Sequence, residues 1–157
     1  MASDEEFMRK AVEKVREGIR LGQTPFGACI VKDGRIVSRA HNTVWIDGDI
    51  TAHAEINAIR KACKKLGTVD LSGCVIYSTT EPCPMCFSAC HWAKIDKIVY
   101  GAKISDAADS GFSELSIPNE RMKMEGGSDV EIVGGVLGEE CRRLFGEWKG
   151  NGEAKTY

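Results

Sequence analysis

Short strand-like segments alternate with helical segments along this chain, and that alternation is the strongest constraint on its fold. An Asp33-Gly34 pair between two strand-like runs, 26–32 and 35–40, predicts a β-hairpin early in the chain. Strands separated by helices predict an α/β sheet that helices cover on both faces. The later segments are strands at 74–78, 97–102 and 129–133 and helices at 52–66, 84–94 and 138–149.

Single residues indicate where several of these segments begin and end. Ser3 and Glu6 form a capping-box pattern that opens a first helix, which Gly22 ends. Thr51 is predicted to cap the second helix. The segment 103–128 has turn-forming Gly, Pro, Asn and Asp residues, and we expect irregular structure there.

The composition fits one globular domain over residues 1–157, with 150–157 as a C-terminal tail. The net charge of −2 argues against tight duplex binding, because phosphate contacts need clustered Lys and Arg. No apolar run is long enough to span a membrane, and the acidic start is unlike a signal peptide. Seven cysteines without such a signal predict a cytoplasmic protein with reduced thiols, some of which bind metal.

Three residues have the spacing and chemistry of a catalytic metal site. Cys83 and Cys86 are three apart at a predicted helix start, so both face one side, and the positive helix terminus favours thiolates. His53, at the start of another predicted helix, can add an imidazole nitrogen. Three protein ligands leave Zn²⁺ one open position, which is typical of catalytic zinc. A structural site would need a fourth ligand, and the sequence has no second closely spaced pair to supply one. We therefore expect one zinc ion per chain.

Glu55, two residues after His53, is the candidate proton carrier. Hydrolytic removal of a ring amino group needs one proton taken from water, one given to a ring nitrogen and one given to ammonia. One carboxylate close to both zinc and ring can move all three. Residues two apart on a helix point in different directions, so the metal must lie near the first helical turn. The pattern H-x-E followed by P-C-x-x-C is typical of zinc-dependent base deaminases.

The chain resembles the cytidine-deaminase-like superfamily, and within it the small bacterial guanine deaminases most closely. The resemblance is dense from about residue 25 to residue 103 and looser afterwards. It implies a three-layer α/β/α fold with a central five-stranded mixed sheet, a catalytic zinc ion and a homodimer. The stretches that carry it are PFGACIVKDG (25–34), HN (41–42), TAHAEINAIRKACKKLG (51–67) and EPCPMCFSACHWA (81–93).

The same resemblance implies roles for residues around the bound base. It implies that Asn42 hydrogen-bonds the base or ribose, that Phe26 and Trp92 wall the pocket, and that the Ala54 backbone N–H faces a ring acceptor. An ordinary core position is the alternative for Trp92. A terminal tyrosine closes over the neighbouring subunit's active site in small guanine deaminases, which implies that role for Tyr157. A disordered tail is the alternative.

The sequence constrains the identity of the substrate less than it constrains the type of reaction. The guanine branch of the family carries an acidic pair after Gly-Phe that assists proton transfer or base recognition, and this chain has Gly111-Phe112-Ser113-Glu114. Glu114 can supply a catalytic carboxylate there, whereas Ser113 departs from the pattern. Guanine or a related aminopurine is the first hypothesis, and cytosine or a small triazine base is the second.

Two further hypotheses stay open. tRNA adenosine deamination is disfavoured, because positive and negative charges alternate along the last predicted helix, 138–149, where those enzymes are basic. A catalytically silent zinc-binding module of the same fold is the non-enzyme alternative. Glu55 argues against it, because nothing structural requires a carboxylate beside the metal.

Overall fold

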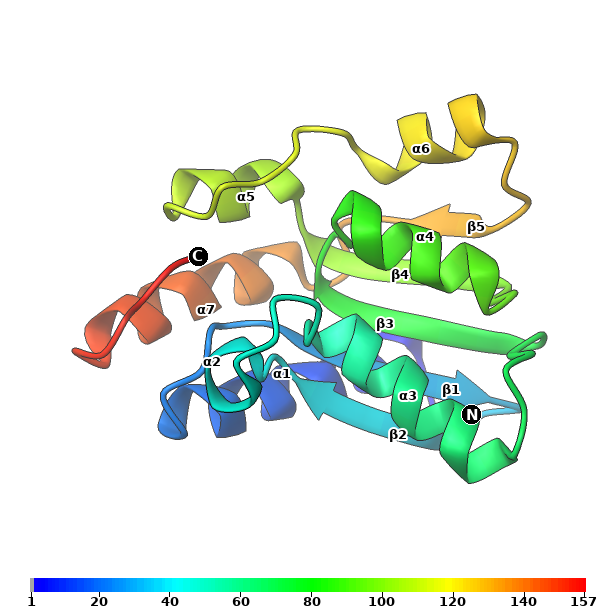
Figure 1. Ribbon diagram of the computed structural model, residues 1–157, viewed down its shortest axis with the longest axis horizontal. Coiled ribbons are helices and arrows are strands. Elements are labelled where there is room, and N and C mark those ends of the chain that lie inside the picture. Colours follow the sequence, from blue (N-terminus) through cyan, green and yellow to red (C-terminus); the bar gives the residue numbers. More distant parts are fainter. Residues whose placement is uncertain (1) are drawn as a thin grey trace.

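Five strands form one sheet in the computed structural model, which describes residues 2–157 (Figure 1). They lie in the order β2-β1-β3-β4-β5; β1 is antiparallel to β2 and β3, whereas β3, β4 and β5 are parallel. The predicted five-stranded mixed sheet is confirmed. The strands are β1 (Gly27–Lys32), β2 (Arg35–His41), β3 (Cys74–Thr80), β4 (Lys97–Ala102) and β5 (Glu131–Val133).

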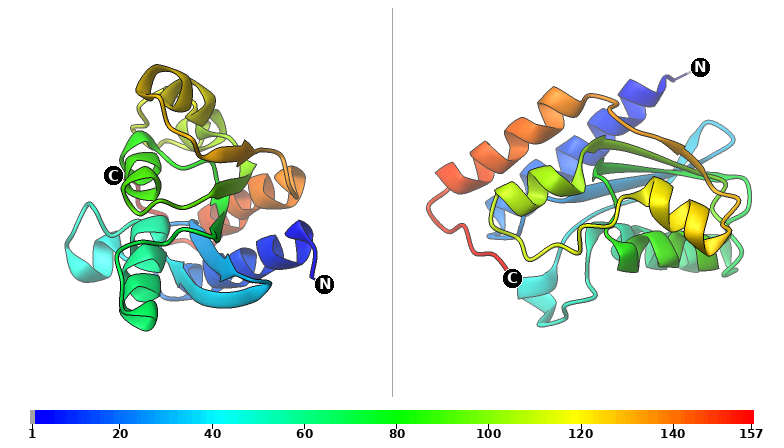
Figure 2. Two further views of the ribbon diagram at one scale, coloured as in Figure 1. Left: turned by 90° about the vertical axis from the view of Figure 1, so that its right-hand side faces the viewer. Right: turned by 90° about the horizontal axis from the view of Figure 1, so that it is seen from above.

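Helices cover both faces of this sheet, as the alternation predicts. The helices are α1 (Asp4–Arg20), α2 (Val44–Asp47), α3 (Ala54–Leu66), α4 (Pro84–Trp92), α5 (Ile104–Asp109), α6 (Asn119–Gly126) and α7 (Gly138–Gly150). Figure 2 shows α1 and α7 on one face and α3 and α4 on the other, so the three-layer arrangement is confirmed. Over residues 2–157, no helix combines the length and apolar character that crossing a membrane requires.

Side-chain alternation along the strands divides the core into two layers. On β1, Cys29 and Val31 pack with the helices α1 and α7, whereas Ala28 and Ile30 pack with α3 and α4. Both faces of β1 and β3 are therefore buried, which explains why these strands have nearly continuous apolar sequences. Asp33 and Gly34 both have positive φ, 50° and 71°, as the turn of a tight hairpin requires.

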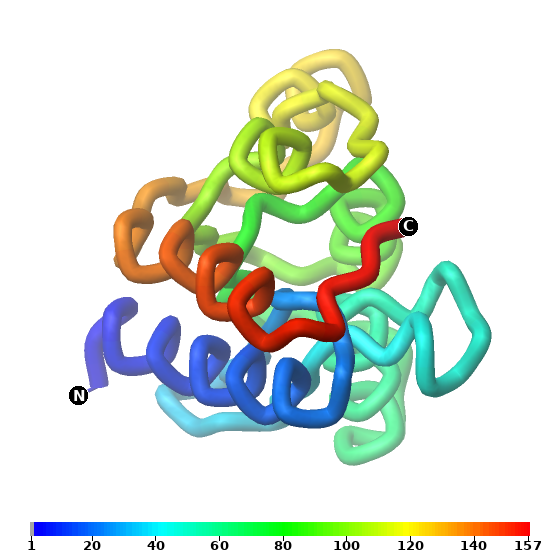
Figure 3. The backbone as a smooth tube through the Cα atoms, turned by 90° about the vertical axis from the view of Figure 1, so that its left-hand side faces the viewer, coloured from blue at the N-terminus to red at the C-terminus, as the bar shows by residue number. Residues whose placement is uncertain are grey.

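The topology brings three parts of the chain to one edge of the sheet. β3 ends at Thr80, and residues 81–83 lead directly into α4; the loop after α2 enters α3 at the same edge. The segment after α7 also runs toward this edge, close to the loop around α2 (Figure 3). The carboxyl ends of parallel strands are where α/β sheets commonly bind ligands.

Helix α3 begins two residues later than predicted, because Asp49 engages Thr51. Asp49 Oδ1 accepts hydrogen bonds from the Thr51 N–H (2.8 Å) and from its hydroxyl (2.7 Å). The residue that precedes the helix is His53, whose side chain makes no capping hydrogen bond. The predicted Thr51 cap is therefore wrong. The His53 imidazole is left available at the helix start.

The segment 103–128 contains the helices α5 and α6, where the sequence predicts irregular structure. Glu81, buried just after β3, accepts hydrogen bonds from the N–H of Ile104 (3.1 Å) and from the N–H of Asn119 (2.8 Å). These are the first residues of α5 and α6. A carboxylate far away in the sequence thus stabilises both helix starts, and no local pattern signals such a contact.

Candidate active site

Two helix starts hold the three predicted metal ligands. His53 directly precedes α3 and Cys83 directly precedes α4, so both lie where backbone N–H groups have no partner within the helix. Pro84 occupies the first position of α4, where its missing N–H is of no consequence. Cys86 follows within the same helical turn, which turns its thiol toward Cys83.

The three ligand atoms converge on one point. His53 Nδ1 lies 3.7 Å from Cys83 Sγ and 3.5 Å from Cys86 Sγ, and all three atoms lie within 4.8 Å of one another. In a tetrahedral zinc site, Zn–S bonds of about 2.3 Å and a Zn–N bond of about 2.05 Å separate nitrogen and sulfur by about 3.6 Å. Across residues 2–157, no other group of three such residues meets the same condition. The donor set and its spacing fit zinc.

The pKa shifts of the Cys83 and Cys86 thiols also favour binding of a cation. A hydrogen bond from Cys86, supported by His53, lowers the pKa of Cys83 to about 4. The same contact and burial raise the pKa of Cys86 well above its ordinary value. The pair thus favours a thiolate at Cys83, and a bound zinc ion would be held by both sulfur atoms as thiolates.

Glu55 faces the metal ligands from the second residue of α3. It is only 5% exposed and lines a small cavity together with His53 and Cys83. That cavity has a volume of about 20 Å³, which is room for about one water molecule. Burial, and then the negative charge of Cys83, raises the pKa of Glu55. The carboxylate thus lies where it can exchange a proton with a water beside the metal ligands.

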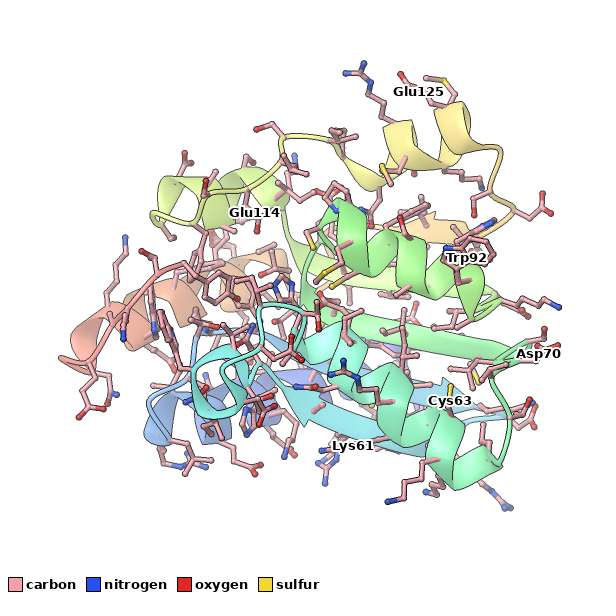
Figure 4. All side chains as sticks on the ribbon, viewed as in Figure 1. Lys61, Cys63, Asp70, Trp92, Glu114 and Glu125 are labelled. Carbon is pink, nitrogen blue, oxygen red and sulfur yellow. The ribbon has the colours of Figure 1, made fainter. Side chains whose placement is uncertain are left out.

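A larger pocket of about 220 Å³ lies beside this cavity and shares His53 and Cys83 with it. Glu114 lines both spaces, and Figure 4 shows it in the loop that follows α5. Burial, and then the negative charges of Cys83 and Glu55, raises the pKa of Glu114 to about 7. The other lining residues of the larger pocket are mainly apolar: Ile50, Pro84, Met85, Phe112, Ser113, Leu115 and Tyr157.

Among the residues predicted to contact a base, Asn42 and Ala54 line neither cavity, but Asn42 bonds Tyr157 and Ala54 follows His53, both of which line them. Asn42, 1% exposed, donates from Nδ2 to Tyr157 Oη at 2.7 Å and accepts at Oδ1 from the Val44 N–H at 3.0 Å. Its amide has a second hydrogen and a second lone pair for a ligand. Phe26 lines the inner cavity. Ala54 is the first residue of α3, so its N–H has no partner within the helix.

The C-terminal tyrosine packs on the site of its own chain. Tyr157 Oη lies 3.4 Å from Thr24 Oγ1 and accepts the hydrogen bond from Asn42. Its ring centroid lies 5.7 Å from that of His53 and 5.4 Å from that of Phe112. The aromatic ring thus separates part of the metal-ligand cluster from solvent.

Trp45 holds this tail in place, a role that the sequence analysis missed. Trp45 Nε1 donates to the Lys155 carbonyl at 3.1 Å, and the Lys155 ammonium lies 3.8 Å from the centroid of the Trp45 ring. The partners are 110 positions apart in the sequence. No local pattern could have identified this contact.

The predicted pocket role of Trp92 is wrong within one chain. Trp92 is the last residue of α4 and Cys86 lies in its first turn, and six residues of α-helix span about 9 Å. Trp92 is 81% exposed and lines a separate surface pocket with Phe87 and Met122. Figure 4 shows it at the end of α4 that is remote from Glu114. The alternative of a core position is wrong as well.

Comparison with known protein families identifies one matching model. The model describes the cytidine and deoxycytidylate deaminase zinc-binding region and matches residues 1–102. The match includes His53, Glu55, Cys83 and Cys86 and ends with strand β4. Glu114 and the tail lie beyond it.

Individual relatives agree with this match. The chain is 47% identical to the guanine deaminase of Bacillus subtilis (strain 168) over 117 residues, which are 74% of this chain and 75% of that protein. It is 38% identical to the tRNA-specific adenosine deaminase of the same organism over 141 residues, 90% of this chain and 85% of that protein. A solved guanine deaminase from Nitrosomonas europaea superimposes with a TM-score of 0.88 at 29% identity, covering 96% of this chain and 86% of that chain.

Removal of one thiol should abolish metal binding while removal of a neighbouring thiol should not. Cys86→Ala is expected to lower the zinc content from about one equivalent per chain to a small fraction, because two protein ligands hold zinc weakly. Cys90→Ala is the matched control, since Cys90 is equally buried on α4 but lies outside the ligand group. Elemental analysis of the purified variants measures both. Equal zinc contents in the two variants would contradict this ligand assignment.

Proposed function

This chain belongs to the family defined by the cytidine and deoxycytidylate deaminase zinc-binding region, and we propose that it deaminates guanine or a closely related aminopurine. The reaction converts guanine and water into xanthine and ammonia. The observation that carries the proposal is the meeting of Glu55, His53 and Cys83 in one cavity, beside a pocket that holds the second carboxylate, Glu114.

The residues of the chain account for the proton transfers of this reaction. Zinc held by His53, Cys83 and Cys86 supplies, when bound, a water whose pKa is lowered to about 7. Glu55 takes a proton from the attacking water and gives it to the ring nitrogen beside the reacting carbon. It then carries the second proton of that water to the departing amino group. The C–O bond forms at the carbon whose C–N bond breaks, so one water is consumed for each ammonia released.

Pocket size and polarity favour a free purine base. The pocket of about 220 Å³ is smaller than the roughly 300–1,000 Å³ typical of drug-sized ligands, and its walls are mostly apolar. Glu114 can accept hydrogen bonds from the ring N–H and amino groups that guanine presents. Asn42 offers one donor and one acceptor. Similarity to two guanine deaminases supports the same assignment.

tRNA adenosine is the second candidate substrate, favoured by a relative that aligns over 90% of this chain. The charge pattern of α7 disfavours tRNA binding by this helix, because Arg142 and Arg143 both form ion pairs with Glu139. A polyanion needs unpaired cations on one face. We therefore rank the free base first.

We also propose a homodimer that works in the reducing cytoplasm. All seven cysteines are free, which suits a compartment where thiols stay reduced. Trp92 on α4 and Met124 on α6 are 81% and 75% exposed, and a second subunit would remove this apolar surface from water. Light scattering at micromolar protein concentration measures the oligomeric state. A monomer would contradict the proposed homodimer.

Ammonia release from a panel of substrates tests the proposed function. We expect guanine to react at least about 100-fold more efficiently, by kcat/KM, than adenine, cytosine, ammeline or guanosine, because each lacks a matching donor pattern or exceeds the pocket. A tRNA with adenosine at the wobble position completes the panel. Preference for any of these others would overturn the guanine assignment, and zinc binding without release from any would identify a silent module.

Loss of the Glu55 carboxylate should strongly reduce turnover and leave zinc binding intact. Glu55→Ala is expected to lower kcat by about 10²–10⁴-fold, because a positioned acid–base group contributes that much. The zinc content should remain near one equivalent, since Glu55 is not a ligand. Stopped assays and elemental analysis on the same preparation measure both quantities. Loss of zinc in this variant would refute the assigned role.

Deletion of residues 151–157 should weaken substrate binding. We expect KM for guanine to rise roughly tenfold or more, because the deletion removes the Tyr157 ring from His53 and opens the site to water. Lys155→Met is a milder companion variant, which loses the cation over Trp45 and keeps the tyrosine. An unchanged KM and kcat in the deletion variant would show that the tail has no part in catalysis.

Mixing two impaired variants, assayed at a guanine concentration well below the KM of the deletion variant, decides whose site the tail covers in a dimer. One chain carries Glu55→Ala with an intact tail, and the other lacks residues 151–157 with Glu55 intact. If the tail crosses to the partner subunit, a mixed dimer has one complete site and regains activity. If each tail stays on its own chain, the mixture shows only the weakened activity of the deletion variant.

A further inference from the structure

Ser78 lies on the central strand β3, directly beneath the Glu55 side chain. Ser78 Oγ donates to Glu55 Oε1 at 2.8 Å, and the serine is only 1% exposed. The same oxygen also lies 2.6 Å from the Thr80 carbonyl oxygen. This buried hydroxyl therefore connects the carboxylate on α3 with the end of β3.

Ser78 occupies a position on β3 where the pattern of the strand would place an apolar residue. Side chains two apart on a strand share a face, so Ile76 and Ser78 both point toward α3 and α4. Ile76 is fully buried in that core layer. This face of β3 therefore changes from apolar to polar at Ser78, near the cavity that Glu55 lines. A buried hydroxyl is costly unless it is hydrogen-bonded, and Glu55 provides that bond.

The Ser78 hydroxyl can stay hydrogen-bonded to the Glu55 carboxyl group whether that group is ionised or protonated. It has one hydrogen and two lone pairs, so it can donate to an ionised carboxylate or accept from a protonated one. While it accepts from Glu55, the Thr80 carbonyl can receive its hydrogen. The contact can therefore persist throughout proton transfer without movement of either main chain.

We propose that Ser78 is a positioning residue that holds the Glu55 carboxylate toward the metal ligands and the substrate. This inference rests on the proposed function only in taking Glu55 to be the proton carrier. Ser78 does not line either cavity around the metal ligands. It therefore acts through Glu55, and its loss should affect the rate of chemistry and not substrate binding.

The matched control is Ser38, which makes a similar contact on the same helix. Ser38 on β2 is 8% exposed and donates from Oγ to the Ala58 carbonyl of α3 at 2.7 Å. Ser38→Ala and Ser78→Ala each remove one buried hydroxyl that is bonded to α3. Only Ser78 bonds Glu55, so the two variants separate positioning from general stabilisation of the helix.

We expect Ser78→Ala to lower kcat about 10- to 100-fold with KM changed less than about threefold, because small misplacement of a reacting group is costly. Ser38→Ala should retain the wild-type kcat, and both variants should retain zinc. Ser78→Thr should restore most of the rate, since it keeps the hydroxyl. A kcat for Ser78→Ala equal to that of Ser38→Ala would overturn the proposal.

A double-mutant cycle with Glu55 supplies a second, independent measurement. In the Glu55→Ala background, Ser78→Ala should not change the residual rate further, and a further tenfold loss would contradict action through Glu55. The same four proteins are compared by denaturant unfolding, where we expect the two substitutions to be non-additive. That measurement needs no substrate. If the wild type deaminates no base, the proposed function fails, while additive unfolding energies would refute the Ser78–Glu55 contact.

Discussion

The convergence of two helix N-termini at one sheet edge is the constraint on which the site depends. His53 and Cys83 each occupy the position directly before a helix, where backbone N–H groups are unpaired and the helix dipole is positive. That field favours the Cys83 thiolate, whereas burial and the charge of Cys83 raise the pKa of Glu55. β3 fixes the distance between the two helix starts, because it leads straight into α4 and carries Ser78 beneath α3.

The charges around this point explain why a divalent cation belongs there. Cys83, Glu55 and Glu114 line one small cavity, where the charge of Cys83 helps to raise the pKa of both carboxyl groups. A dication among two thiolates and an imidazole balances that charge at the ligands. Glu81 lines the same cavity, but its carboxylate is occupied by the backbone N–H groups of two helix starts. Glu81 therefore stabilises the fold, whereas Glu55 and Glu114 are the carboxylates that we propose to take part in the reaction.

Features that depend on neighbouring residues could be predicted from the sequence, and features that depend on distant contacts could not. The Asp33-Gly34 turn and short strand-like runs predicted all five strands, and the Cys83–Cys86 spacing predicted the ligand pair. The direction of Trp92 depends on how α4 lies against its neighbours, which spacing along one helix does not reveal. The start of α6 depends on Glu81, which is 38 positions earlier. Ser78 gives a partial signal, as a polar residue on an apolar strand face.

The family match covers the metal ligands and Glu55 but only part of the pocket beside them. The match ends at residue 102, after the metal ligands and Glu55, whereas Glu114 and the tail come later. The first part is built from helix starts and a central strand, which tolerate little displacement. The second part is built from a loop and a chain end, which can change without moving the metal ligands. We infer that the residues after 102, Glu114 and the tail among them, contribute to selecting which ring reaches Glu55.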